Sequence, residues 1–351
     1  MWQLENRTPY AAERTWVRDR DGAEIWLVAV KCSFDIAPDG ETSVAPEQPP
    51  VAQAPVFVDE AAPQPNLLYE MDLVRTKQTT DVLLIGHAHA PGGVPVAQID
   101  VGLRVGPIAK RLRVMGDRVW LGGSPSEPQP FVTMPLVWER AYGGVDPWTR
   151  DAPNPQFDVR NPVGTGFALE AAHAEGMRLP NIEYPDQLVR AWNDRPEPAG
   201  FGPLCNHWQP RAGFAGTYDE AWQRERLPLL PVDFDDRHYQ CAPADQQAPQ
   251  FLAGGEPVML INLWPHGEML RFELPRVILG METFFSDGQR VLHERPALHT
   301  VIVEPDRSRV ALVWHSALPC HPKVHKLLKT RIFEKRLVRL GEHPDEAGVP
   351  A

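Results

Sequence analysis

The stretch AEIWLVAVKCSFDI, residues 23–36, decides the fold class, because it is rich in the β-branched and aromatic residues that favour strands. Asp-Gly dipeptides, which favour tight turns, stand at 21–22 before the stretch and at 39–40 after it. These boundaries predict one long strand with a turn at each end.

Other stretches show the same composition and are separated by short turns. Residues 81–86 predict a further strand. Gly116 begins a two-residue loop, and glycine at that position suits a type II′ turn, which needs a positive φ. Three antiparallel hairpins are therefore predicted, with strands at 110–115 and 118–121, at 257–263 and 268–274, and at 300–304 and 309–314.

Proline and tryptophan are unusually frequent, above all in the middle of the chain. The 351 residues include 38 prolines and 11 tryptophans, and 18 of those prolines lie between residues 124 and 256. Such a chain cannot be mostly helical, because proline lacks an amide donor and disrupts helix interiors. The middle shows little periodicity, so we expect ordered but irregular loops packed on a β core, with short helices at 188–192 and 219–224.

Together these patterns predict a mainly β protein: an antiparallel β-sandwich or barrel-like sheets, with long proline-rich ordered loops and few short helices. Three regions follow from the changes in composition. They are an N-terminal β region at 1–122, a proline- and tryptophan-rich irregular region at 123–256, and C-terminal β hairpins with a basic terminal segment at 257–340. The sequence leaves open whether the three form one domain and whether the chain oligomerises.

The charge balance and the apolar runs argue against several classes of protein. The net charge is −11, whereas a nucleic-acid-binding surface needs a basic footprint. No apolar run reaches the roughly 18 residues that a membrane-spanning helix requires. The first residues lack the layout of a secretory signal, so we expect a cytoplasmic protein. The four cysteines form no CxxC pair and are then expected to be reduced and buried: Cys32, Cys205, Cys241 and Cys320.

Two clusters contain side chains of the kind that bind metal ions. His87 and His89 are two residues apart, so on a strand both imidazoles share one face. Cys320, His321 and His325 form the second cluster, in which the histidines lie one turn apart if the segment is helical. Neither cluster has the four ligands in paired spacings that structural zinc usually takes. Ordinary strand-end and surface histidines are the simpler interpretation, and we expect neither a metal nor a cofactor.

The segment 321–339 is basic on an otherwise acidic chain, since seven lysines and arginines stand there against Glu334 alone. Such a stripe either docks an acidic partner or is a solvated face that balances acidic neighbours. Its apolar spacing favours a helix somewhat over a strand.

The sequence contains no GxSxG elbow, no GxxxxGK[ST] phosphate loop, no HExxH helix and no GxGxxG loop. Acidic residues are frequent in the tryptophan-rich middle, for example Glu139, Asp233, Asp235 and Asp236. Paired carboxylates can support glycoside hydrolysis, so a carbohydrate-active or other hydrolase is the alternative function. The ordinary interpretation is that these acids cap turns or pair with arginine.

Several phrases of the chain are more particular than turn chemistry requires. They are GDRVW at 116–120, WERAYGG at 138–144, NPVGTGF at 161–167, LPNIE at 179–183, GFGP at 200–203, WQPR at 208–211, AGTYD at 215–219, LPVDFD at 230–235, ADQ at 244–246 and LAGGE at 252–256. In this order they resemble the bacterial family known as domain of unknown function 2169, and the resemblance covers roughly residues 1–335.

The resemblance implies a role in the type VI secretion system. Members of that family look like cytoplasmic adaptor-chaperones that accompany toxic effectors, often effectors with a PAAR-like tip domain. They help to load the effector onto the valine-glycine-repeat spike protein. The expected partner is therefore a protein, not a nucleic acid or a membrane, and the resemblance implies no catalytic residue.

Aromatic and arginine side chains concentrate binding energy at protein interfaces, so those in the loop-like middle are candidates for partner contact. The alternative for the same side chains is that they pin the loops to the β core. The candidates are Trp138, Arg140, Tyr142, Trp148, Trp208, Arg211 and Tyr218.

Overall fold

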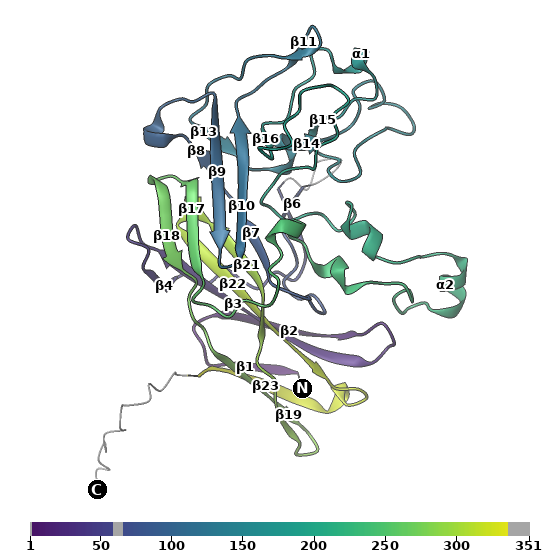
Figure 1. The fold of residues 1–351 in the computed structure, drawn as a ribbon. Coiled ribbons are helices and arrows are strands. Elements are labelled where there is room, and N and C mark those ends of the chain that lie inside the picture. The colour runs from purple at the N-terminus through teal and green to yellow at the C-terminus, as the bar shows by residue number, and fades with distance from the viewer. Residues whose placement is uncertain (1, 59–65, 336–351) are drawn as a thin grey trace.

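The computed structural model describes residues 2–58 and 66–335. Over these residues the chain is mainly β, and the two α-helices have only four and six residues. Figure 1 shows the long strands at the centre and base of the molecule, with the irregular loops above them and to one side. The expected mainly β class with long ordered loops is confirmed, and none of the described sheets closes into a barrel.

The strand expected at 23–36 lies in the middle of a six-stranded sheet. Its order is β2, β3, β22, β21 and β7, with β4 beside β3, and every neighbouring pair is antiparallel except β21 and β7. Because β3 and β22 have a strand on each side and a layer on each face, both are buried almost throughout. The strands are β2 (Ala11–Arg18), β3 (Glu24–Ile36), β4 (Thr42–Val44), β7 (Asp81–Leu84), β21 (Ala297–Glu304) and β22 (Arg309–Pro319).

A five-stranded antiparallel sheet has the order β16, β10, β9, β17 and β18. Its strands alternate buried and exposed residues, which is the pattern of a sheet with one face on the core and one face in solvent. The strands are β9 (Gln98–Val105), β10 (Ile108–Met115), β16 (Ile182–Glu183), β17 (Pro257–Trp264) and β18 (Gly267–Glu273).

A four-stranded sheet at the base of the molecule joins the two ends of the described chain. Its strands, in spatial order, are β1 (Gln3–Asn6), β23 (Leu327–Glu334), β19 (Leu279–Phe285) and β20 (Arg290–Leu292). The helix favoured for the basic segment is therefore wrong for residues 327–334, which form a strand because they pair with β1 and β19. Residues 336–339 of that segment lie outside the described residues.

One hydrophobic cluster joins the inward faces of all three sheets. Val28 and Leu312 contribute to it from the six-stranded sheet, Leu103 and Leu260 from the five-stranded sheet, and Ile332 from the base. These side chains are 0–2% exposed, so each contributes the roughly 1.5–3 kcal/mol expected for a fully buried aliphatic residue. Strands from both ends of the chain therefore share one core.

Two of the three predicted hairpins are confirmed, by β17 with β18 and by β21 with β22. The hairpin predicted around Gly116 is wrong, because β10 pairs with the preceding β9 and residues 120–121 pair with a later segment. Glycine is needed at position 116 because the backbone of Gln129 lies very close, not because the φ angle is positive. A Cβ atom there would lie 1.6 Å from the carbonyl oxygen of Gln129.

The middle of the chain is built from short elements connected by loops. The helix expected at 219–224 is confirmed by α2, whereas residues 188–192 are not helical, since the carboxylate of Asp194 binds the amides of Arg190 and Ala191. Within the described residues, the helices fall short of the length and hydrophobicity that a membrane-spanning helix needs.

The remaining elements of the described residues are two α-helices, seven 3-10 turns and four two-stranded pairs. The helical ones are α1 (Ala171–Ala174), α2 (Glu220–Glu225), η1 (Pro91–Gly93), η2 (Trp138–Arg140), η3 (Arg211–Phe214), η4 (Asp236–Tyr239), η5 (Ala244–Gln246), η6 (Pro305–Arg307) and η7 (Val324–Lys326). The paired strands are β5 (Val56–Phe57) with β6 (Leu67–Tyr69), β8 (His87–His89) with β13 (Thr133–Pro135), β11 (Trp120–Leu121) with β12 (Ser124–Pro125), and β14 (Tyr142–Gly143) with β15 (Thr165–Gly166).

Candidate binding site

A cleft of about 760 Å³ is lined mainly by the loops that connect β16 to β17. Tyr184, Pro210 and Phe214 give it apolar walls, and the exposed side-chain amides of Gln187 and Gln209 give it donors and acceptors. Apolar walls with a small number of polar groups are the usual composition of a binding site. We call this feature the cleft.

An arm of residues 215–235 projects from the body beside the cleft and contains α2 (Figure 1). It leaves the body at η3 and returns at η4, and both of these turns line the cleft. The amide of Asp235 donates to the carbonyl of Phe214 at 3.0 Å, and the Arg237 guanidinium lies 4.2 Å from the centre of the Phe214 ring. The base of the arm is therefore fixed by both backbone and side-chain contacts.

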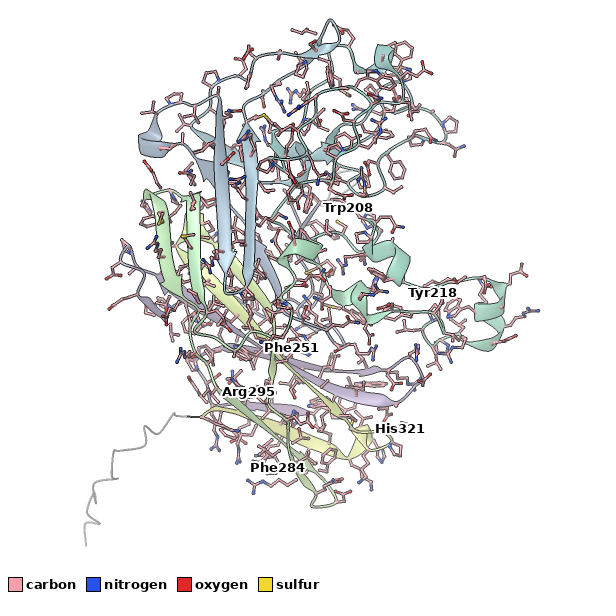
Figure 2. All side chains as sticks on the ribbon, in the orientation of Figure 1. Trp208, Tyr218, Phe251, Phe284, Arg295 and His321 are labelled. Atoms are coloured by element: carbon pink, nitrogen blue, oxygen red, sulfur yellow. The ribbon has the colours of Figure 1, made fainter. Side chains whose placement is uncertain are left out.

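The arm has its own small set of internal contacts. Asp219 caps α2 by accepting from the amide of Trp222 at 2.8 Å, and the Trp222 indole donates to the carbonyl of Leu229 at 2.9 Å. Figure 2 shows Tyr218 out on the arm, away from Trp208 in the body. Three large apolar side chains of the arm remain in solvent: Tyr218 (51% exposed), Leu227 (60%) and Val232 (68%).

A buried lysine on β10 holds in place Asp245, which lines the cleft. Lys110 Nζ donates to the carbonyl of Gly200 at 2.6 Å, to Asp245 at 2.9 Å and to Gln246 at 2.8 Å, while the Tyr184 hydroxyl donates to the other oxygen of Asp245. Burial lowers the pKa of Lys110 to about 8, although the Asp245 carboxylate acts in the opposite direction. All three ammonium protons are already used, so the lysine holds the loops in place.

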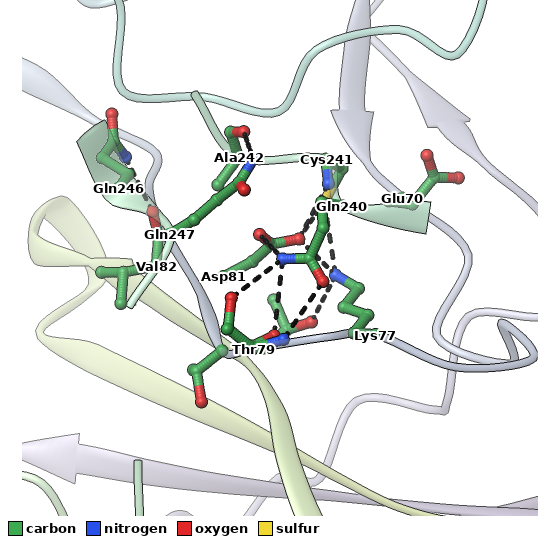
Figure 3. Close-up of polar contacts among 12 residues, drawn as sticks. Glu70, Lys77, Thr79, Asp81, Val82, Gln240, Cys241, Ala242, Gln246 and Gln247 are labelled. Atoms are coloured by element: carbon green, nitrogen blue, oxygen red, sulfur yellow. Dashed lines mark hydrogen bonds and ion pairs between the residues drawn. The ribbon is translucent and has the colours of Figure 1, made fainter. Parts of the chain in front are cut away.

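A second buried network lies behind the segment that carries Gln240 (Figure 3). Lys77 Nζ donates to Asp81 at 2.6 Å and to Thr300 at 3.0 Å, and Asp81 also accepts from the Gln240 amide and from the backbone of Cys241, both at 2.8 Å. Burial alone would lower the pKa of Lys77, but the Asp81 carboxylate outweighs it and raises that pKa. The network anchors one wall of the cleft to β7 and β21.

Burial is also the main reason that the pKa of Cys241 rises to about 12, so its thiol stays protonated and unreactive. All four cysteines are buried and none forms a disulfide, as the sequence predicts.

The profile of one family, described as "Uncharacterized protein conserved in bacteria (DUF2169)", matches residues 21–315. The chain belongs to this family. No curated protein and no solved structure matches the chain.

Several phrases that carry the family resemblance contact one another in the structure. Arg118 of GDRVW binds Glu183 of LPNIE at 2.5 Å, and Asn161 of NPVGTGF donates to the carbonyls of Trp138 and Tyr142 in WERAYGG. The phrases at 200–203 and 244–246 meet at the ammonium of Lys110. The phrases that carry the resemblance therefore include residues whose contacts hold the loops together.

Three of the aromatic candidates for partner contact are buried in this DUF2169 chain. The Trp138 indole donates to the carbonyl of Pro203 at 2.9 Å, and its ring meets that of Trp208 edge-on at 6.2 Å. Tyr142 lies in a separate cluster of apolar side chains. The burial of these three rings is what the packing alternative describes, although Trp138 also lines the cleft, and their contact with a partner stays a prediction.

The two arginine candidates also bind within the chain. Arg211 is buried, forms an ion pair with Glu70 at 2.7 Å and donates to the carbonyl of His238 at 3.0 Å, so it ties η3 to η4 at the base of the arm. Arg140 is half-buried and donates to Asn181 at 2.9 Å. Both are positioning residues for the loops around the cleft.

Trp148 and Tyr218 are the candidates that the structure places in solvent. Trp148 is 70% exposed on the loop that follows β14. Its ring stacks on His173 at 4.3 Å, and His173 is held by Asp146 at 2.8 Å. These two aromatic rings are available to a partner.

The metal-ion candidates fall into two separate places. His87 and His89 both bind the carboxylate of Asp306, at 2.7 and 2.8 Å. Cys320 is buried, with its thiol 3.6 Å from a backbone carbonyl, whereas His321 and His325 are exposed. Over residues 2–58 and 66–335, no three or more histidine, cysteine or acidic side chains are grouped so as to hold a metal ion.

The acidic side chains proposed for the hydrolase alternative are each engaged by a neighbouring donor. Glu139 accepts from the amide of Asn66 at 2.8 Å, and Asp233 accepts from the hydroxyl of Thr217 at 2.8 Å. Asp235 pairs with Arg237, and Asp236 pairs with Arg75. The hydrolase alternative stays a prediction from sequence.

The sequence interpretation missed the residues that shape the cleft. Lys110, Tyr184 and Gln240 come from three distant segments, and no local pattern connects them. The sequence feature that could have indicated Lys110 is the ADQ phrase at 244–246, because its acid and amide side chains bind that lysine.

Proposed function

We propose that this chain is a non-enzymatic, cytoplasmic adaptor-chaperone of the type VI secretion system. It binds an effector that carries a PAAR-like tip domain and assists its loading onto the valine-glycine-repeat spike protein. Family membership and the role that the resemblance implies support this proposal. The observation that carries it is the arm, which presents three apolar side chains to solvent beside a cleft with apolar walls.

The physical argument concerns how such a surface binds a polypeptide. Covering exposed apolar surface yields about 25 cal/mol per Å² removed from water, and the arm offers that surface on a fixed support. Because the base of the arm is already held by Arg211 and Phe214, less conformational entropy is lost when a partner binds. The glutamine amides of the cleft can pair with the backbone of an extended segment.

The experiment co-expresses the chain with the effector encoded by the adjacent gene and measures soluble effector and co-purification. Substituting Tyr218, Leu227 and Val232 together with alanine is expected to weaken effector binding at least about tenfold, because each side chain loses its apolar contact. The matched control replaces Val44, Val94 and Leu292, three exposed apolar residues away from the arm, with alanine.

Equal loss of effector binding in the arm variant and the control variant would contradict the role of the arm in binding the effector. The proposed function itself fails if the effector stays soluble and is secreted normally by cells that lack this chain, or if the chain fractionates with membranes.

A further inference from the structure

The outer face of the five-stranded sheet combines arginine with exposed apolar side chains. Strand register places these residues in two neighbouring rows across β10, β9, β17 and β18. One row is Ala109, Arg104, Met259 and Arg271, and the next is Arg111, Gly102, Ile261 and Met269. We call these eight residues the sheet face.

Three arginines of the sheet face have no direct ion-pair or hydrogen-bond partner among the described side chains. Within the described part of the chain, Arg104, Arg111 and Arg271 form no ion pair and their guanidinium groups donate no hydrogen bond. The nearby acid of β9, Asp100, is already bound by Arg113 through two contacts, of 2.7 and 3.1 Å. The charge of Arg111 still acts on Asp100, whose pKa it helps to lower after the larger effect of Arg113, but positive charge without a direct partner collects here on a chain whose net charge is −11.

The sheet face is also hollowed. A groove of about 460 Å³ runs over Gly102 and Ala109, where the side chains are smallest, and Met259 and Ile261 form its apolar side. Arg104 and Arg111 stand along the same groove. Methionine and arginine are both enriched in protein interfaces, and an apolar side chain of a partner fits such a dip.

We propose that the sheet face is a docking surface for a protein segment in which apolar side chains alternate with or flank carboxylates. The apolar side chains enter the groove over Gly102, and the carboxylates pair with Arg104 and Arg111. Charge complementarity selects this occupant, because the acidic remainder of the chain repels an acidic partner while the sheet face attracts it. The proposal does not depend on the cleft or the arm.

Two other occupants are less favourable. A second copy packed face to face around a two-fold axis would bring the same arginines together, and like charges in contact destabilise an interface. A nucleic acid would meet only this small basic area on a strongly acidic protein.

The experiment uses the full chain and a fluorescent peptide in which leucine alternates with glutamate, with fluorescence anisotropy as the readout. The comparison peptide has lysine in place of each glutamate. We expect binding of the glutamate peptide, at least tenfold weaker binding of the lysine peptide, and an affinity that falls as salt concentration rises. Labelled duplex DNA serves as the third probe.

The test variant is Arg104→Glu combined with Arg111→Glu. Its matched control is Arg150→Glu with Arg190→Glu, which changes the net charge equally at two exposed arginines outside the sheet face. The test variant is expected to bind the glutamate peptide at least tenfold more weakly than the control. Equal affinity of the two variants, tighter binding of DNA than of peptide, or dimerisation through this face in sedimentation would overturn the proposal.

The arm variant separates the sheet-face proposal from the proposed function. Alanine at Tyr218, Leu227 and Val232 leaves the sheet face intact, so peptide affinity is expected to be unchanged even where effector binding is lost.

Discussion

The sheets and the loops at 123–256 are both well packed, but they satisfy their backbone polar groups in different ways. In the six-stranded sheet, β3 and β22 pair residue by residue along the whole of β22. In the loops, buried polar side chains take over this task. Asn161 donates to two carbonyls, and Asp146 accepts from the amides of Trp148, Thr149 and Leu169.

The same device connects the loops to the sheets. The side-chain amide of Gln246 donates to the carbonyl of Val82 in β7 at 2.7 Å and to that of Phe201 at 2.9 Å. A buried backbone group without a partner costs free energy, so loops without ladders need such side chains to stay ordered. We infer that stability in the sheets resides in apolar contacts and ladders, and that stability in the loops resides in a few polar side chains.

The strongest test of this comparison is Asn161→Ala. The substitution removes the Asn161 donor from the buried carbonyl of Tyr142 and one of two donors from that of Trp138, which keeps the amide of Ala141, so the free energy of unfolding is expected to fall by about 2 kcal/mol. Asn154→Ala, at an exposed position of the same loop region, is the control and is expected to change it by less than about 0.5 kcal/mol. Urea denaturation measures both. Equal stability of the two variants would contradict the role given to buried polar side chains.

The same contrast explains how much of the fold the sequence could predict. The long strand and two hairpins were predictable because their apolar runs and turns are local signals. The basic segment was misread because β23 has a register shift at Leu328 opposite Phe284 and Phe285. Because of this irregularity Leu327 and Ile332 are both buried although they are five residues apart, a spacing that a regular strand would place on opposite faces, so the apolar pattern fits a helix better than a strand.

The candidate site was less predictable than the fold. The sequence named Tyr218, Trp148, Trp138 and Trp208 alike as candidates for partner contact or for packing, although the first two are exposed and the last two are buried. Composition shows that a ring is apolar, but not whether another loop covers it. Lys110 was missed because its role depends on loops that meet only in the folded chain.

A second prediction concerns acid stability of the sheet core. His315 is 2% exposed, stacks on His299 at 4.5 Å, and its two ring nitrogens have no hydrogen-bond partner among the described residues. Burial lowers the pKa of His315 to about 3, and the charge of nearby Lys77 acts in the same direction. The unfolded chain therefore binds the proton first, and stability contributed by the neutral ring is lost as pH falls from about 6.5 towards 3.

The expected slope from this residue is up to about 1.4 kcal/mol per pH unit within that window. His315→Phe keeps a ring in the same place and removes the titration, so its urea midpoint should fall less steeply with acid than that of the wild type. His299 and His293, whose pKa values burial also lowers, titrate in the same direction, so part of the slope remains. An unchanged slope in the variant would show that acid unfolding begins elsewhere, in the loops.

The smallest expected effect is that of Trp148→Ala, because this ring is 70% exposed and its main contact is the stack on His173. The free energy of unfolding should change by less than about 0.5 kcal/mol, which is the usual range for surface substitutions. Trp208→Ala, in the interior of the same loop region, is the matched comparison and should cost about 3–5 kcal/mol through the cavity it leaves. If the Trp148 variant instead unfolds as readily as the Trp208 variant, the exposed ring supports the loop, and its role as a surface for partners is lost. If it is stable but binds the effector more weakly than wild type, the partner surface extends beyond the arm to the loop that follows β14.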